Sequence, residues 1–263
     1  MTQERPTYTA NFDNLAVRVY KDQTSLAEAA GSAVADILKN AVHQKGAAAV
    51  VFATGNSQLT FLNTLGKKVN KEVWAQVTAF HLDEYVGISS SHKSSFRHWI
   101  KDKVEKQFSP KTVNYIQGDA DDLQAECKRY EACLKPYLDE GLLDLCCLGV
   151  GENGHLAFNE PHTTDFSDPS LVKVVELSLA SRNQQVNEGH FPSIKEVPKL
   201  AITLTIPAIL AAQAVVALAS ESRKAKVVRD MLFGEVSNGC PGSVLRTHHN
   251  ATLYLDAESA FLL

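Results

Sequence analysis

The 263-residue sequence lacks a long apolar segment, an excess of positive charge and a secretory leader. No stretch approaches the roughly 20 apolar residues that cross a bilayer, and residues 1–14 lack the basic and apolar pattern of a signal peptide. We therefore expect a cytoplasmic protein with no membrane contact. The net charge of −4 gives no general attraction to nucleic acid. Any anionic ligand must be held by a local site.

Paired cysteines and metal motifs are also missing. The five cysteines form no C-x-x-C motif, and Cys146 and Cys147 are adjacent on an expected strand, so their side chains should point to opposite faces. We interpret all five as reduced thiols that pack like small apolar residues. The histidines show no H-x-x-x-H spacing, so we predict no metal site.

What the sequence does contain is a repeated alternation of apolar strands and helices. A strand at 15–20 precedes a helix with apolar residues from 26 to 41, capped at Thr24 and Ser25 and ended by Gly46. The continuous apolar run at 47–53 is typical of a strand buried on both faces. We expect further strands at 77–82, 113–116, 143–148, 214–219 and 251–255, and helices at 59–65, 96–104, 123–138 and 227–233. This order predicts an α/β fold with a doubly wound, mostly parallel sheet flanked by helices, in one domain over residues 1–263.

Two regions are less regular. Residues 1–14 read as a polar start outside the folded part. Strands at 172–177 and 200–204 enclose a polar segment, 180–198, that is too long for an ordinary connection. We interpret this segment as a loop that forms a lid or a ligand wall.

Candidate phosphate-binding residues follow the apolar run at 47–53. Thr54, Gly55, Asn56 and Ser57 form a turn of small and polar residues between a strand and a helix, where backbone N–H groups can bind phosphate. A capped turn without a ligand is the alternative. Two cations elsewhere, Arg182 in the polar segment and Lys224 at the start of a helix, either bind phosphate or are solvated surface charges.

Candidate acid and base residues follow two other strands. Asp83 and Glu84 come after the strand at 77–82, and only one of them can easily face the crevice; we favour Asp83 as the base, with capping or ion pairing as the alternative. After the strand at 143–148, three glycines precede His155, and Glu160 follows five residues later. A carboxylate near an imidazole can orient it for proton transfer, although a structural histidine remains an alternative.

These runs resemble a known family. HLDEYVG at 81–87 and GVGENGHLAFNEP at 149–161 are similar to two hallmark segments of the glucosamine-6-phosphate deaminase (isomerase) family, whose relatives include the 6-phosphogluconolactonases. The motif order is similar from about residue 15 to 259 and includes SRKA at 222–225 and CPGSVLR at 240–246. FNEP at 158–161 favours the deaminase branch over the lactonase branch.

The resemblance implies a modified Rossmann-like sheet and an isomerisation with deamination, in which glucosamine 6-phosphate and water give fructose 6-phosphate and ammonia without a redox cofactor. It implies that His155, supported by Glu160, opens the sugar ring and that Asp83 moves a proton between C2 and C1. The turn at 54–57, with Arg182 and Lys224, would hold the phosphate.

Departures from the family pattern limit this comparison. Asn153 stands where many members have aspartate; an amide can orient His155 but cannot stabilise its cation as a carboxylate does. Asn56 and Gln58 replace a small residue and a proline. An amide-rich wall at 183–191 replaces the usual sequence after Arg182, and no basic cluster for an allosteric sugar is evident at 163–170.

Three readings of the function remain at this point. The first is an amino-sugar phosphate deaminase; the second is a lactonase or an isomerase acting on a related phosphosugar. The third is a non-catalytic sugar-phosphate sensor, which would not need Asp83, His155 and Glu160 together. A small phosphosugar is the expected partner in each. The sequence leaves open the gluco or galacto configuration of the substrate and whether the chain forms a homo-oligomer.

Overall fold

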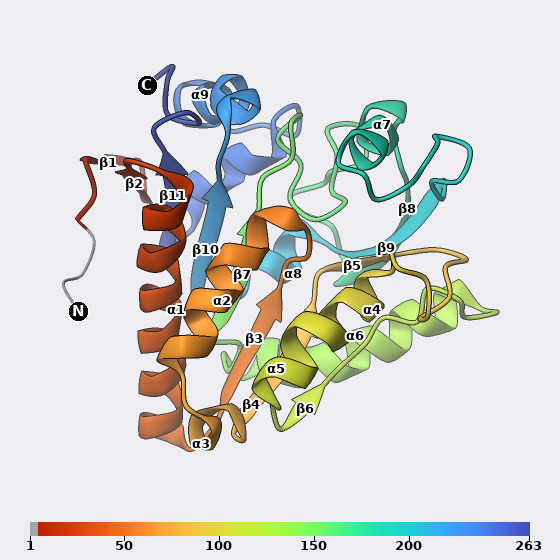
Figure 1. The fold of residues 1–263 in the computed structure, drawn as a ribbon. Helices are drawn as coiled ribbons and strands as arrows, with labels where there is room; N and C mark the ends of the chain where they lie inside the picture. Colours follow the sequence, from red (N-terminus) through yellow and green to blue (C-terminus); the bar gives the residue numbers. More distant parts are fainter. Residues whose placement is uncertain (1–4) are drawn as a thin grey trace.

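An eight-stranded sheet runs through the centre of the computed structural model, which describes residues 5–263 except for the side chain of Asn56 (Figure 1). In chain order its strands are β1 (Tyr8–Phe12), β2 (Leu15–Tyr20), β3 (Ala48–Phe52), β4 (Val77–His81), β6 (Thr112–Val113), β7 (Leu145–Gly149), β10 (Ala214–Ala219) and β11 (Ala251–Asp256). Only the β1–β2 pair is antiparallel. The expected mostly parallel α/β sheet is confirmed.

The spatial order of the strands reverses at one point. The order across the sheet is β1-β2-β11-β10-β7-β3-β4-β6, so the chain proceeds outward from β3 through β4 to β6 and then returns to the other side of β3 as β7. In an open α/β sheet, such a reversal leaves a crevice beyond the carboxyl ends of the two central strands. The topology therefore places a ligand crevice at the ends of β3 and β7.

Helices cover both faces of this sheet. The helices α1 (Gln23–Lys45), α2 (Leu59–Lys68), α3 (Lys71–Trp74), α4 (Phe96–Ile100) and α5 (Lys106–Phe108) contribute to one core, and α6 (Leu123–Asp139), α8 (Ile206–Leu210) and α9 (Ala225–Phe233) to the other. Cys146 lies in one core and Cys147 in the other, as strand alternation predicts. No helix among residues 5–263 is long and apolar enough to span a membrane.

A second, smaller sheet stands beside the first. It is antiparallel and consists of β5 (Asp83–Tyr85), β9 (Leu200–Leu204) and β8 (Val172–Glu176), with β9 in the middle. The backbone N–H of Leu204 donates to the carbonyl oxygen of Leu82 (2.8 Å), which joins this sheet to the chain leaving β4. The expected strands at 172–177 and 200–204 thus exist, but they lie outside the parallel sheet.

Several local expectations were wrong. Part of the polar start forms β1, because Tyr8 to Phe12 pair with β2. The polar segment is not simply a loop: its first part forms α7 (Leu179–Asn187), whose start is capped by the side chain of Ser178. Helix α1 is capped by Asp22, whose carboxylate accepts from the backbone N–H of Ser25 (2.7 Å), and not by Thr24 or Ser25.

Candidate active site

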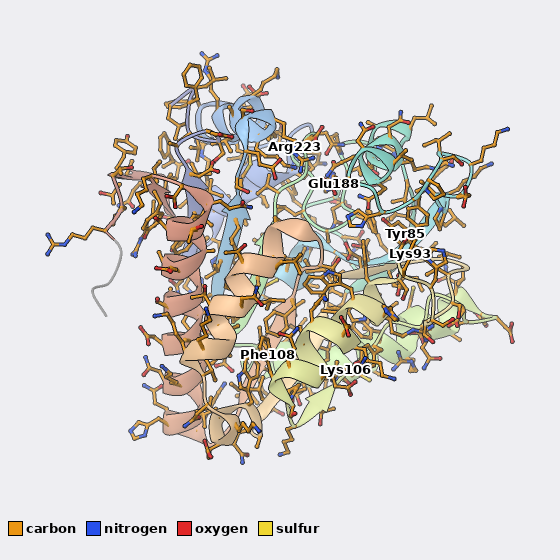
Figure 2. All side chains as sticks on the ribbon, viewed as in Figure 1. Tyr85, Lys93, Lys106, Phe108, Glu188 and Arg223 are labelled. Atoms are coloured by element: carbon orange, nitrogen blue, oxygen red, sulfur yellow. The ribbon has the colours of Figure 1, made fainter. Side chains whose placement is uncertain are left out.

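A cleft opens at the carboxyl ends of β3, β4, β7 and β10, at the reversal of the strand order. Its lining includes most of the residues selected from the sequence together with the wall formed by α7: Thr54, Gly55, Ser57, Asp83, His155, Gln184, Gln185, Glu188, His190, Arg223 and Lys224. Two of these, Glu188 and Arg223, lie close together in Figure 2. The fold therefore brings together side chains that are up to 170 residues apart (54 to 224).

Asp83 reaches the cleft because β5 alternates its side chains. Asp83 and Tyr85 share one face of the strand, and Glu84 points to the other. Asp83 is buried, and the loss of hydration, with the nearby charge of Glu84, raises its pKa well above the ordinary value. A carboxylate with a raised pKa is a stronger base than an exposed one, so Asp83 is suited to removing a proton from carbon.

The backbone of Asp83 is held by a buried histidine. His81 Nδ1 donates to the carbonyl oxygen of Asp83 (2.9 Å), and His81 Nε2 accepts from the backbone N–H of Ile116 (2.9 Å). Both bonds require the neutral ring, and burial lowers the pKa of His81 to about 4. His81 therefore has a structural role here.

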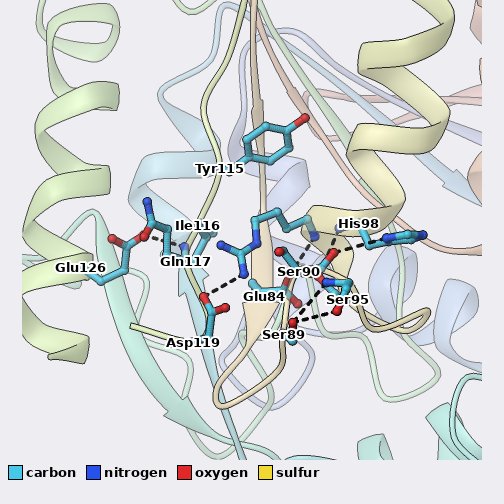
Figure 3. A network of polar contacts seen from close by, with 12 residues as sticks. Glu84, Ser89, Ser90, Ser95, His98, Tyr115, Ile116, Gln117, Asp119 and Glu126 are labelled. Carbon is cyan, nitrogen blue, oxygen red and sulfur yellow. Dashed lines mark hydrogen bonds and ion pairs between the residues drawn. The ribbon is translucent and has the colours of Figure 1, made fainter. Parts of the chain in front are cut away.

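Glu84 also has a structural role, which Figure 3 shows. Its carboxylate accepts from the backbone N–H groups of Tyr85 (2.9 Å), Phe96 (3.0 Å) and Arg97 (2.8 Å) and from the hydroxyl of Ser95 (2.6 Å). Two of these N–H groups belong to the first turn of α4, which has no intrahelical acceptors for them. Glu84 thus attaches α4 to β5, and Asp83 alone of the pair faces the cleft.

His155 is oriented by a chain of hydrogen bonds. Its Nδ1 donates to Oδ1 of Asn153 (2.7 Å), and Nδ2 of Asn153 donates to Oε2 of Glu160 (3.4 Å). The other oxygen of Glu160 accepts from the backbone N–H of Ser178 (3.1 Å). Glu160 therefore acts on His155 through Asn153, an arrangement that the sequence spacing did not reveal.

Burial and charge keep the His155 ring neutral. Loss of hydration, and then the positive charge of Lys224, lower the pKa of His155 to about 4. Because Nδ1 carries the proton, Nε2 is free to accept one. The ring packs directly against Gly151, where an added Cβ would lie 2.2 Å from Cε1 of His155. A side chain at position 151 would therefore displace the His155 ring.

A buried lysine and a turn of small polar residues also line the cleft. Lys224 ends the short 3₁₀-helix η3 (Ser222–Lys224), and burial, followed by the charge of Arg223, lowers its pKa to about 8. The turn after β3 leads into η1 (Asn56–Gln58) and α2, with Gly55 at φ +105°. Thr54, Gly55 and Ser57 line the cleft; the side chain of Asn56 lies outside the described part of the structure.

Arg182 lies outside the cleft, so the expectation that it binds the phosphate there was wrong. Its guanidinium donates to the carbonyl oxygens of Ile194 (2.6 Å) and Val197 (3.0 Å). Arg182 is absent from the lining of the cleft, whereas Gln184 and Gln185 of the same helix belong to it. Arg182 instead ties α7 to the segment that follows it.

Arg223 is a second cation in the cleft that our sequence reasoning missed, although it precedes Lys224 in the SRKA run. It forms ion pairs with Glu152 (2.8 Å), Glu188 (2.9 Å) and Glu221 (2.8 Å). Burial opposes ionisation of Glu188, but hydrogen bonds, led by that from His190, lower its pKa to about 2. Arg223 thus connects three walls of the cleft.

The cleft at the reversal of the strand order combines a raised-pKa carboxyl, a neutral imidazole and a buried lysine, which are groups that an enzyme needs to move protons on a small anionic ligand. Residues 21–254 match the family of glucosamine-6-phosphate isomerases and 6-phosphogluconolactonases. The chain belongs to this family. Among residues 5–263, no group of three or more His, Cys, Asp or Glu side chains is arranged to hold a metal ion.

Similar proteins carry the name of one branch. The chain is 35% identical over 246 residues to a glucosamine-6-phosphate deaminase of Bacillus cytotoxicus, covering 94% of this chain and 88% of the relative. It is 37% identical over 234 residues to a glucosamine-6-phosphate deaminase of Lactobacillus delbrueckii subsp. bulgaricus, covering 89% and 94%.

Solved structures agree with the fold. A structure described as a monomeric glucosamine-6-phosphate deaminase superposes with a TM-score of 0.84 at 33% identity, covering 94% of this chain and 99% of the other. A 6-phosphogluconolactonase from Neisseria gonorrhoeae, described as putative, superposes with a TM-score of 0.70 at 20% identity, covering 91% and 98%. The second likeness concerns the fold alone.

Proposed function

We propose that this chain converts glucosamine 6-phosphate and water into fructose 6-phosphate and ammonia. The observation that carries the proposal is the convergence of Asp83, His155 and Lys224 on one cleft, in a chain about 35% identical to deaminases. Binding alone does not need a buried base and an oriented imidazole, so a sensor accounts less well for the site. The likeness to lactonases lies at the level of the fold, so we favour the deaminase reaction.

Binding of the phosphate comes first. Lys224 supplies a positive charge, and the turn of Thr54, Gly55, Asn56 and Ser57 supplies backbone N–H groups at the start of a helical segment. Tethering the phosphate positions C1 and C2 of the sugar, which lowers the entropic part of the barrier. Arg182 has no part in this step, because its guanidinium is bound to backbone carbonyls elsewhere.

Ring opening follows and depends on His155. The free Nε2 accepts the proton of the anomeric hydroxyl and returns a proton to the ring oxygen as the bond from C1 to that oxygen breaks. Asn153 keeps Nδ1 protonated and the ring in place, and Glu160 holds Asn153. The neutral state of His155 suits a group that must first accept a proton.

Asp83 then catalyses the isomerisation by moving a proton from C2 to C1. Its carboxylate removes the proton from C2 while the C2 ammonium gives a proton to the aldehyde oxygen O1, which yields an enolamine. The same carboxyl then returns its proton to C1. The resulting imine at C2 is hydrolysed by water, which leaves a ketone and releases ammonia. Burial of Asp83 raises its pKa and so strengthens it as a base for this transfer.

The test is release of ammonia by the purified chain. Glucosamine 6-phosphate and galactosamine 6-phosphate are supplied separately, hydrolysis of 6-phosphogluconolactone is followed in parallel, and the Asp83→Asn variant serves as the control. We expect ammonia from an amino sugar with the wild-type chain and very little with the variant. Lactone hydrolysis without ammonia release would overturn the proposal.

Two broader points belong to the same proposal. We treat residues 1–263 as one sugar-phosphate domain, because the cleft takes side chains from both sheets. We also place the protein in the cytoplasm, since all five cysteines are free thiols, which suits a reducing compartment.

A further inference from the structure

One amide on α7 is fixed in orientation and lines the cleft. Tyr85 Oη donates to Oε1 of Gln185 (2.6 Å), and both side chains are buried. With its oxygen engaged by Tyr85, the amide directs Nε2 elsewhere. Among residues 5–263, Nε2 of Gln185 donates to no acceptor. Gln185 is therefore a preorganised donor in a cleft that binds a small molecule.

Tyr85 is rigid enough to hold this amide. Its ring is fully buried and packs against Phe96, Phe158 and Phe191, with ring centroids 4.8, 5.5 and 5.3 Å away. Burial also raises the pKa of Tyr85 well above its usual value, so the phenol stays protonated and remains a donor. Because the phenol donates to Oε1 of Gln185, the amide oxygen is occupied and Nε2 is the free end of this side chain.

The same strand positions the base and the amide. Asp83 and Tyr85 lie on one face of β5, so Asp83 faces the cleft directly and Tyr85 acts on it through Gln185. A sugar whose reacting carbons lie at Asp83 must also lie against the wall formed by α7, because both line the same cleft. The neighbouring Gln184 is not equivalent, because its Nε2 already donates to Oε1 of Glu188 (2.9 Å).

We propose that Gln185 is a specificity-determining residue, whose Nε2 donates to a non-reacting hydroxyl of the phosphosugar at C3 or C4. A buried donor left without an acceptor is costly, so a sugar that lacks this hydroxyl, or carries it in the other configuration, binds less well. This inference rests on the proposed deaminase function and adds the feature by which the site reads the configuration of the sugar.

The experiment compares sugars that lack one hydroxyl at a time. Wild type and Gln185→Leu are assayed for kcat/KM on glucosamine 6-phosphate and on its 3-deoxy and 4-deoxy analogues. For wild type, we expect kcat/KM to be roughly ten- to a hundred-fold lower on one analogue than on glucosamine 6-phosphate. For Gln185→Leu, kcat/KM on glucosamine 6-phosphate should already be lower by about the same factor, and it should fall little further on that analogue. Unchanged discrimination by Gln185→Leu among all three sugars would overturn the assignment.

Matched variants separate this role from a general effect on folding. Gln184→Leu, an identical change one residue away, should keep the wild-type pattern. Tyr85→Phe removes only the hydroxyl that holds the amide and should weaken the discrimination by about three- to ten-fold. If Gln185→Leu does not fold, Gln185→Glu keeps the acceptor for Tyr85 and replaces the free donor with an acceptor; wild-type discrimination by this variant would equally overturn the assignment.

A binding measurement distinguishes this proposal from the proposed reaction. If wild type releases no ammonia from any amino sugar, the deaminase function fails. Calorimetric binding of the same three phosphosugars to wild type and Gln185→Leu then decides the role of Gln185. Loss of discrimination in the variant supports it, and equal discrimination by both proteins refutes it.

Discussion

Asn153 Oδ1 lies 2.7 Å from Nδ1 of His155, so a neutral amide, and not a carboxylate, orients the imidazole in this cleft. The amide cannot point the other way without turning its NH₂ group toward the protonated Nδ1, and it would lose its bond to Glu160. The Glu160 carboxylate therefore acts on the His155 ring only through the side chain of Asn153. The bond to Asn153 keeps the proton on Nδ1, so Nε2 of His155 is available as an acceptor.

Replacing Asn153 with aspartate should raise the pKa of His155. A carboxylate at this distance stabilises the imidazolium, so we expect the pKa to rise from about 4 by about one to three units. The measurement is the pH titration of the His155 ring signals by NMR, assigned with His155→Gln. Asn153→Leu, which removes the orienting bond without adding charge, should leave the pKa low. An unchanged pKa in Asn153→Asp would contradict the geometry.

Replacing Asp83 with asparagine should affect the chemical step. We expect kcat to fall by about 10² to 10⁴ with KM nearly unchanged, because an amide of the same shape cannot accept the C2 proton. In wild type, kcat/KM should decline as the pH falls through the raised pKa of Asp83, at a higher pH than for an exposed aspartate. Equal losses in binding and turnover would show that Asp83 is not the base.

Lys224 should determine the decline of activity at alkaline pH. The pKa of about 8 means that Lys224 in the free protein is charged below that pH and loses its attraction for phosphate above it. We expect kcat/KM to fall above about pH 8 in wild type and to remain level in Lys224→Arg, whose charge persists. The pH profiles of kcat/KM for the two proteins check this. The same decline at alkaline pH in both proteins would refute it.

Removing the charge of Glu188 should strengthen phosphate binding. Glu188 lines the cleft and pairs with Arg223 there (2.9 Å), so its negative charge opposes the binding of a phosphate in the same cleft. Because the Arg223 side chain is 37% exposed, the pair is worth about 0.5–1 kcal/mol, and Glu188→Gln should lower KM roughly two- to five-fold. Glu72→Gln, an equal change of net charge on exposed α3, should leave KM unaltered. A higher KM in Glu188→Gln would indicate that Glu188 assists binding.

Glu84 should matter for stability more than any exposed ion pair nearby. Glu84→Ala leaves three backbone N–H groups without their acceptor, and we expect a loss of about 3–5 kcal/mol in the free energy of unfolding. Urea titration followed by circular dichroism measures it. Asp119→Ala, which breaks the exposed pair with Arg97 (2.8 Å), should cost less than about 1 kcal/mol. Similar losses in both variants would contradict this assignment.

Strand periodicity predicted most of the central sheet, because strands buried on both faces require continuous apolar runs. Residues 48–52, 145–149 and 214–219 form such strands within one or two residues of the expected bounds. Strand ends then pointed to Asp83, His155 and Lys224, since parallel strands bring their carboxyl ends to one edge. The second sheet escaped prediction because β5 is only three residues long and pairs with a strand more than a hundred residues away.

By itself, the sequence determined the α/β class, the edge of the sheet that carries the cleft, and three residues that line it, Asp83, His155 and Lys224, because these follow from local periodicity and from chain order. Only the tertiary structure decided that Arg182 faces away, that Asn153 stands between His155 and Glu160, and that Tyr85 holds Gln185. Each of these depends on the direction of a side chain and on a partner elsewhere in the fold. Spacing along the chain does not encode such directions; packing in three dimensions does.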